Sequence, residues 1–158
     1  MRPPKYPLEP LARLRAQKVD EAARVLAGAV TRRETAERVR LGAEQRRASQ
    51  EEEAKGVRDV EAEELLRGHL RVADLARAGA WEVRVASDRE KLALALTRAR
   101  EEEGKAHEGE KEARESVAAK RADAEVVEKD AARWREGVRK RAETKEEDAA
   151  SEAWRRKE

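Results

Sequence analysis

Apolar residues recur every seven positions through the second half of the chain. One series begins at Val85, and a second begins four residues later, at Arg89. The two series are Val85, Leu92, Ala99, Ala106, Ala113, Lys120, Val127 and Trp134, and Arg89, Leu96, Glu103, Glu110, Val117, Ala124, Ala131 and Val138. Alternating steps of three and four residues are typical of a coiled-coil seam, and a strict seven-residue repeat predicts a left-handed supercoil.

A looser stripe follows the first half of the chain. It comprises Leu8, Ala12, Arg15, Val19, Ala22, Leu26, Ala29, Arg33, Ala36, Arg40 and Ala43, with Leu11, Leu14, Val25 and Val30 beside it. Between the halves, the segment RGHLRVAD contains Gly68, and glycine commonly ends helices. We therefore predict an all-α fold, a long two-helix antiparallel coiled-coil hairpin that forms a single domain. Its helices cover about 8–66 and 74–155, and its turn covers about 67–73.

All four prolines lie within the first ten residues of the chain. Proline inside a helix removes a hydrogen bond and clashes with the preceding turn, at a cost of about 3 kcal/mol. In the opening turn of a helix it costs no intrahelical bond. Pro7 and Pro10 therefore indicate where the first helix begins, and the rest of the chain is free to be helical.

The two stripes also predict a register for the hairpin. An antiparallel arrangement sets them against each other in layers whose residue numbers add up to 142 or 143. The predicted layers are Leu8 with Trp134, Ala12 with Ala131, Val19 with Ala124, Leu26 with Val117, Arg33 with Glu110, and Arg40 with Glu103. This register centres the turn on residue 71 and gives two seam glutamates an arginine partner, which half-buried charges require. The pattern leaves a slip of seven residues open.

The composition supports extended helices over a globular core. Charged residues make up 46 % of the chain, aromatic residues make up 3 %, and phenylalanine is absent. Such usage is typical of coiled coils. Disorder is the competing interpretation, because a highly charged chain with little apolar surface cannot offset its entropy. The helical spacing of the apolar residues and the strong helix formers between them favour ordered helices.

Charge is distributed unevenly along the chain. The net charge is +2, yet residues 1–50 carry 12 Lys/Arg against 6 Asp/Glu, and residues 51–110 carry 11 against 16. The first part is therefore basic and the middle is acidic, which polarises the surface potential. Binding of nucleic acid by the basic part is the weakest functional alternative, because acidic residues alternate with the basic ones and no aromatic residues interleave them.

Targeting and catalytic signals are absent from the sequence. No apolar run approaches the ~20 residues that span a bilayer, and the chain contains no cysteine, so we expect a cytoplasmic protein. The two histidines, His69 and His107, are far apart, and no metal-ligand spacing or glycine-rich phosphate loop is present. The carboxylate runs at 51–53 and 101–103 are typical of solvated helix faces. We therefore expect no enzyme, no cofactor and no metal.

Three segments of the chain resemble a known family. KYPLEPLARLRAQKVDEAARVLAGA resembles the amino-terminal pattern of the FliJ/YscO family of type III secretion stalk proteins, with its Pro-Leu-x-x-Leu step followed by LRxxxxDEA. LARAGAWEVRVASDREKLALALTRAREEE is similar to the start of that family's second helix, and WREGVRKRAETKEEDAASEAWRRK is similar to its charged end. The resemblance spans nearly the whole chain.

The resemblance implies a specific fold and function. The family forms an antiparallel two-helix coiled coil similar to the shaft of rotary ATPases. It sits in the pore of a hexameric export ATPase, reaches the cytoplasmic ring of the export gate and couples the two without catalysis. Some members also handle secretion chaperones. We would then expect a protein at the cytoplasmic base of the apparatus that is monomeric when isolated. Flagellar and virulence systems both have such a stalk, and the tryptophan-bearing end is more similar to the virulence branch.

The same resemblance assigns contact residues. The proline-bearing end would enter the ATPase ring, which implies ring contacts at Leu8, Leu11, Arg13, Leu14, Arg15 and Trp154. A patch near the start of the second helix would contact the export gate, which implies Trp81 and Val85. Packing inside the hairpin is the alternative: it is favoured for Leu8 and Trp81 and evenly balanced for Leu11 and Leu14. Trp154 lies in the part of the second helix that extends past the first, where no surface of the hairpin is expected to bury it.

A second function class also fits the sequence. A generic coiled-coil scaffold would dimerise and hold protein partners apart. The oligomeric state separates the two classes, because a stalk is a monomeric hairpin and a parallel scaffold is a dimer about twice as long. The break at RGHLRVAD favours the hairpin.

Overall fold

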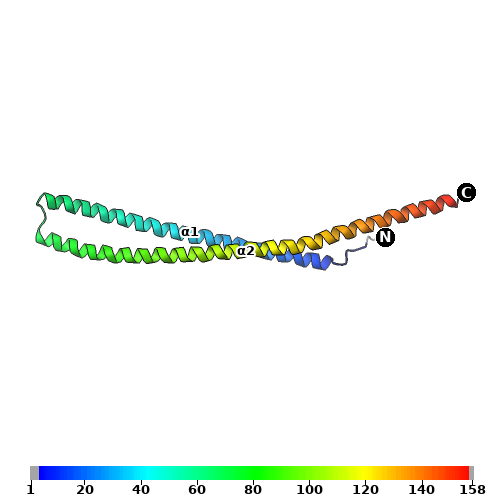
Figure 1. Ribbon diagram of the computed structural model, residues 1–158, viewed down its shortest axis with the longest axis horizontal. Coiled ribbons are helices and arrows are strands. Elements are labelled where there is room, and N and C mark those ends of the chain that lie inside the picture. The colour runs from blue at the N-terminus through cyan, green and yellow to red at the C-terminus, as the bar shows by residue number, and fades with distance from the viewer. Residues whose placement is uncertain (1–3, 157–158) are drawn as a thin grey trace. The chain divides into compact units, whose positions relative to one another are not determined.

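The protein consists of two long helices joined by a short turn. A computed structural model describes residues 4–156. Helix α1 spans Glu9–Leu66 and helix α2 spans Val72–Arg155. The two run antiparallel and pack against each other, with residues 67–71 connecting them (Figure 1). The predicted all-α hairpin is confirmed, and the turn lies inside the predicted segment.

The start of α1 follows from its prolines. Residues 4–6 have no regular structure, because a residue that precedes proline is driven toward extended backbone. The backbone NH of Glu9 donates to the Tyr6 carbonyl at 3.2 Å, and that of Ala12 donates to Leu8 at 3.0 Å. Pro10 occupies the first turn, where its missing NH is not needed.

The end of α1 is a Schellman motif centred on Gly68. This glycine has φ +72°, in the left-handed region that residues with a Cβ rarely adopt. The NH of Gly68 donates to Leu65 at 3.0 Å, and the NH of His69 donates to Glu64 at 3.1 Å. These are the two bonds that define the motif, so the chain turns because of its local sequence.

The start of α2 is capped from within the helix. The Asp74 carboxylate accepts a hydrogen bond of 3.0 Å from the backbone NH of Arg71. An acidic residue three positions into a helix commonly bonds back to the residue before it in this way, and its charge also favours the positive end of the helix dipole.

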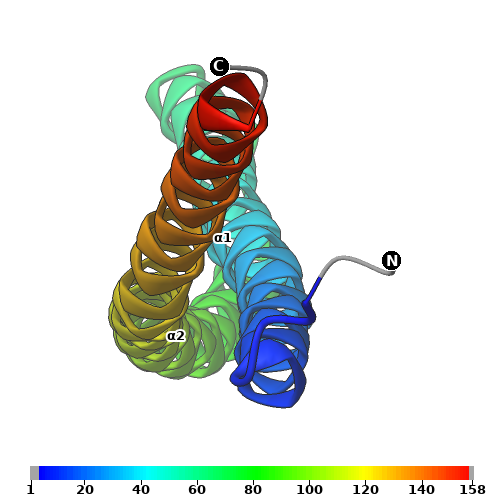
Figure 2. The ribbon, with the colours of Figure 1, turned by 90° about the vertical axis from the view of Figure 1, so that its right-hand side faces the viewer.

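The described residues fall into two compact units. The turn unit comprises residues 28–111, and the end unit comprises residues 4–27 and 112–156. In each unit a segment of α1 packs against a segment of α2. Figure 2 looks at the structure from the side of the chain termini, with the dark blue start of α1 and the red end of α2 nearest the viewer.

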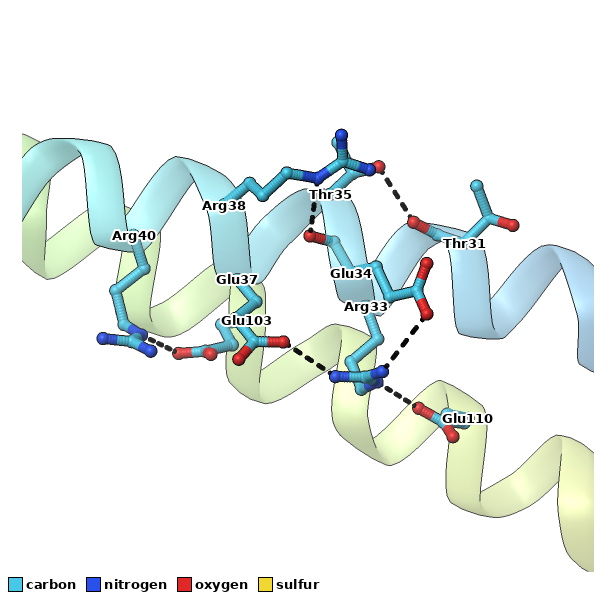
Figure 3. Close-up of polar contacts among 9 residues, drawn as sticks. All are labelled: Thr31, Arg33, Glu34, Thr35, Glu37, Arg38, Arg40, Glu103 and Glu110. Atoms are coloured by element: carbon cyan, nitrogen blue, oxygen red, sulfur yellow. Dashed lines mark hydrogen bonds and ion pairs between the residues drawn. The ribbon is translucent and has the colours of Figure 1, made fainter.

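In the turn unit, the predicted seam is confirmed by its ion pairs. Arg33 Nε lies 2.7 Å from a Glu110 carboxylate oxygen, and Arg40 Nε lies 2.7 Å from Glu103 (Figure 3). These are the two arginine–glutamate layers that the register predicts. Because each pair bridges the helices, a slip of seven residues is excluded within this unit.

Further cross-helix pairs flank the seam of the turn unit. Arg58 donates to both carboxylate oxygens of Glu82, at 2.6 and 3.0 Å. This hydrogen-bonded guanidinium holds the pKa of Glu82 below its usual range. The other flanking pairs are Arg89 with Glu51 at 2.7 Å and Arg100 with Glu44 at 3.0 Å.

The buried core is thin and rich in alanine. In the turn unit, Ala43, Leu96 and Ala99 form one buried cluster. Alanine buries little area, and burial contributes about 25 cal/mol per Å². The cross-helix ion pairs therefore have an unusually large share in fixing how the two helices align.

The end unit corrects one predicted layer. Its core contains Tyr6, Val127 and Ala131, against which Leu11, Ala12 and Trp134 pack. Ala12 packs against the cluster that contains Ala131, which agrees with the predicted layer. The prediction that Leu8 lies in the core against Trp134 is wrong, since Leu8 is 45 % exposed. The helical stripe does not extend to Leu8 because α1 begins only at Glu9, and Tyr6 takes the place opposite Trp134.

Candidate interaction surfaces

The non-helical residues before α1 are held against α2 by Tyr6. Its ring lies 5.6 Å from that of Trp134, with an interplanar angle of 59°. Its hydroxyl donates a hydrogen bond of 2.5 Å to the Asp130 carboxylate. This bond to Asp130, together with partial burial, raises the pKa of Tyr6 to about 12. We call this arrangement of Tyr6, Asp130 and Trp134 the tyrosine clasp.

Sequence reasoning did not single out Tyr6. It is the only tyrosine of the chain, and it directly precedes Pro7. An aromatic residue held in extended backbone just before a helix could have been interpreted as a staple onto the partner helix. The seven-residue pattern gave no such signal, because Tyr6 lies outside the helix.

The leucines expected at the ATPase ring differ in exposure. Leu8 is 45 % exposed and Leu14 is 49 % exposed, whereas Leu11 packs into the core of the end unit. Of the three, Leu8 and Leu14 are the ones available to a partner.

The two arginines expected at the ring also differ. Arg13 is exposed and lies 3.3 Å from Glu9, its neighbour one turn earlier. Arg15 is half-buried and lies 2.6 Å from Asp123 of α2. Arg15 therefore links the two helices of the end unit, and Arg13 is the cation available for contact with another molecule.

The carboxyl-terminal part of α2 is exposed on all sides. From Arg139 onward, every side chain described in residues 139–152 and 154–156 is exposed. Trp154 is 68 % exposed. This stretch of helix is polar on all sides and does not pack against another part of the described chain. Its exposed tryptophan makes it a candidate contact surface for another molecule.

The residues expected at the export gate lie mostly inside the hairpin. Val85 is only 7 % exposed, and Trp81 is half-buried. Val85 is therefore not available for contact while the hairpin is closed. The apolar residues that α2 exposes in this segment are others, notably Val83 and Leu94.

The turn carries a group of exposed aliphatic residues that the seven-residue pattern did not identify. Leu66 is 88 % exposed and Val72 is 84 % exposed, and Leu65 and Leu75 are also exposed. They flank the turn because both helices end there, which leaves these side chains without an opposite helix. These residues are recognised by their position beside the turn in the structure and not by their spacing in the sequence.

Within residues 4–156, no group of three or more His, Cys, Asp or Glu side chains is arranged to hold a metal ion. Neither helix, over the part that the structure describes, has an apolar stretch long enough to cross a membrane.

Comparison of the chain with protein-family models, curated proteins and solved structures found no match. Function must therefore be inferred from the fold, the exposed surfaces and the sequence resemblance.

Proposed function

We propose that this protein is the non-enzymatic central stalk of a type III secretion system. Its open end inserts into the hexameric export ATPase at the cytoplasmic base of the apparatus, and the hairpin couples that ATPase to the ring of the export gate. The observation that carries the proposal is the antiparallel two-helix hairpin in which α2 continues as an exposed helix past Val138. The resemblance of the sequence to the FliJ/YscO family supports this function for the hairpin.

The end unit offers suitable groups for a ring contact. Leu8 and Leu14 supply exposed apolar surface at the start of α1, and Arg13 supplies a cation. Trp154 supplies an exposed aromatic ring on α2, a residue type enriched at protein interfaces. The tyrosine clasp holds the start of α1 against α2, so Leu8, Arg13 and Leu14 lie at the base of the exposed extension of α2. Trp154 lies further along that extension, about 30 Å from Trp134 along the helix.

The cross-helix pairs suit a part that transmits force. Arg33 and Arg40 each bridge to α2, and each also contacts a glutamate on its own helix at 2.8 Å. Moving α1 along α2 would separate these half-buried charges from their partners, which is costly. Within the turn unit, a fixed register resists sliding of one helix along the other when the ATPase pushes the stalk.

A dimeric spacer is the alternative function. It would need the seam residues to face a second chain. The intrachain layers of Arg33 with Glu110 and of Arg40 with Glu103 favour the hairpin instead, because they leave the seam already occupied.

Light scattering coupled to size exclusion tests the proposal. The full chain is mixed with the hexameric export ATPase from the same genome, in the presence of a nucleotide analogue. We expect one chain per hexamer and a loss of the complex with Leu14→Asp/Trp154→Ala. Arg38→Glu, an exposed residue of the turn unit, is the matched control and should leave the complex intact. Absence of a complex with the intact chain, or equal loss with the control, would overturn the stalk assignment.

A further inference from the structure

The face of α2 directed away from α1 carries a second seven-residue pattern in the turn unit. Between Ala73 and Thr97 the residues at alternating steps of three and four are Ala73, Ala76, Ala80, Val83, Ser87, Glu90, Leu94 and Thr97. All of them are exposed, and Val83 is 71 % exposed. Only Glu90 is charged, in a chain where 46 % of residues are charged. We call these eight residues the outer face.

The outer face is distinct from the seam. Val85 and Leu96 lie in the seam and are buried. On a helix with seven residues per two turns, the positions of Ala80 and Val83 fall on the side opposite the seam. Five of the eight residues are apolar and two more are small and uncharged, so the outer face is a weakly polar stripe at coiled-coil spacing that no helix of the described chain covers.

A column of basic residues runs along one edge of the outer face. It recurs every seven residues through five successive heptads: Arg77, Arg84, Lys91, Arg98 and Lys105. Seven residues of helix advance about 10.5 Å, so the column presents cations at regular intervals. This regularity matches the edge positions of a coiled coil, where charges select the partner.

The cations of this column are available. Within the described part of the chain, the guanidinium groups of Arg84 and Arg98 form no ion pair. The other three contact acidic residues of their own helix: Arg77 contacts Asp74 at 3.7 Å, Lys91 contacts Asp88 at 3.0 Å and Lys105 contacts Glu102 at 2.6 Å, and the three basic side chains are 70–80 % exposed. Exposed ion pairs of this kind contribute about 0–1 kcal/mol, so a carboxylate of a partner can take the place of the neighbouring carboxylate.

We propose that the outer face of α2 is a docking site for an acidic amphipathic helix of another protein. The partner helix would place small or aliphatic side chains over Ala80, Val83 and Leu94. Its glutamates, spaced by seven residues, would face the basic column. The outer face is separate from the ring contacts and the seam, and it lies in the segment of α2 that the resemblance assigns to the export gate. The proposal does not require the stalk assignment, because it rests on the exposed residues and the basic column alone.

Charge argues against a second copy of this chain as the occupant. If two outer faces packed antiparallel, the two basic columns would meet along one edge. If they packed parallel, each basic column would face the edge that holds Gly79, Ala86 and Ala93, which carries no acidic group. An acidic helix would avoid the repulsion between basic columns and would supply the acidic groups that this chain lacks at the opposing edge.

Fluorescence anisotropy with the full chain tests the proposal. The probe is a labelled synthetic helix of four heptads with leucine and alanine at the seam positions and glutamate at the edges. We expect saturable binding, weakened about tenfold or more by Arg84→Glu/Arg98→Glu, because the charge pairs become repulsive. Val83→Asp/Leu94→Asp should abolish binding. Both pairs of residues are exposed, so helicity by circular dichroism should not change.

Control variants and probes distinguish a helix-docking site from a membrane-binding or self-associating face. Arg38→Glu/Arg46→Glu makes the same charge change on α1 and should leave binding within about twofold, and a probe with lysine at the edges should not bind. Failure of the acidic probe to bind, or equal weakening by the α1 control, would overturn the proposal. Binding to anionic vesicles that Arg84→Glu/Arg98→Glu removes, without binding of the probe, would assign the face to a membrane instead. A dimer in sedimentation equilibrium that Val83→Asp/Leu94→Asp dissociates would assign it to a second copy.

Discussion

The Arg33 guanidinium lies 2.7 Å from the Glu110 carboxylate across the seam, and Glu110 is only 4 % exposed. This pair, repeated by Arg40 and Glu103 at 2.7 Å, aligns the helices of the turn unit. In a seam composed largely of alanine, little else distinguishes one heptad from the next. The register is therefore held by paired charges rather than by shape.

Reversing the charge of one member of this pair should destabilise the protein, and reversing the other member as well should restore part of the lost stability. Glu110→Arg places two guanidinium groups together and should lower the free energy of unfolding. Adding Arg33→Glu restores an opposite pair, and we expect a coupling of about 1–3 kcal/mol in a double-mutant cycle. Urea unfolding measures it. Because Arg33 also lies near Glu34 and Glu37, recovery should be incomplete. Purely additive effects would show that the pair does not set the register.

The tyrosine clasp should be visible in the titration of its hydroxyl. The chain contains one tyrosine, so absorbance near the phenolate band reports Tyr6 alone. We expect a midpoint near its raised pKa of about 12, and a midpoint closer to the ordinary value in Asp130→Asn. A raised folded pKa contributes stability that is complete below about pH 10 and is lost as the pH rises from about 10 to about 12. A wild-type midpoint at the ordinary value would mean that the clasp is open in solution.

Truncation of two leucines that lie two positions apart should change stability to very different extents. Leu96 is 4 % exposed in the cluster with Ala43 and Ala99, whereas Leu94 is 51 % exposed. Leu96→Ala should cost about 2–4 kcal/mol in thermal or urea unfolding, because it removes a rare large side chain from a thin core. Leu94→Ala should change stability by less than about 0.5 kcal/mol. Equal losses would contradict the assignment of seam and outer face.

Glycine substitutions should separate the turn from the helices. Gly68 has φ +72°, so Gly68→Ala forces a Cβ into the left-handed region and should cost about 1–2 kcal/mol. Gly56 lies inside α1, and a Cβ there would meet nothing within 4 Å. Gly56→Ala should therefore stabilise the protein by about 1 kcal/mol. A neutral Gly68→Ala, measured by the shift in melting temperature, would argue against the Schellman turn.

Much of the fold could be predicted from the sequence because it depends on local residue preferences and on a regular spacing of apolar residues. The heptads from Val85 to Trp134 predicted the seam, and Gly68 predicted the turn. The register followed from setting the two stripes against each other about a turn near Gly68, and the pairing of Arg33 with Glu110 and of Arg40 with Glu103 supported it. Periodicity alone would have left every heptad equivalent.

The surfaces could be predicted less well, for two physical reasons. Leu8 was assigned to the stripe by its spacing, but spacing applies only inside a helix, and α1 begins at Glu9. Val85 was assigned to a partner by resemblance, yet its seven-residue spacing already placed it in the seam. Tyr6 contacts Trp134 from outside the helix, and no periodic rule describes such a contact.

Crosslinking within the seam tests the central claim, a hairpin formed by one chain, most directly. The chain has no cysteine, so Ala43→Cys/Ala99→Cys introduces a single possible bridge between two residues of one buried cluster. Ala43→Cys/Ala106→Cys, one heptad away, is the control. After mild oxidation we expect the first variant to form a disulfide within a species of 17.9 kDa, and the control to form none within the chain. A disulfide-linked dimer from the first variant would contradict the hairpin and, with it, the stalk, leaving a dimeric spacer as the better account.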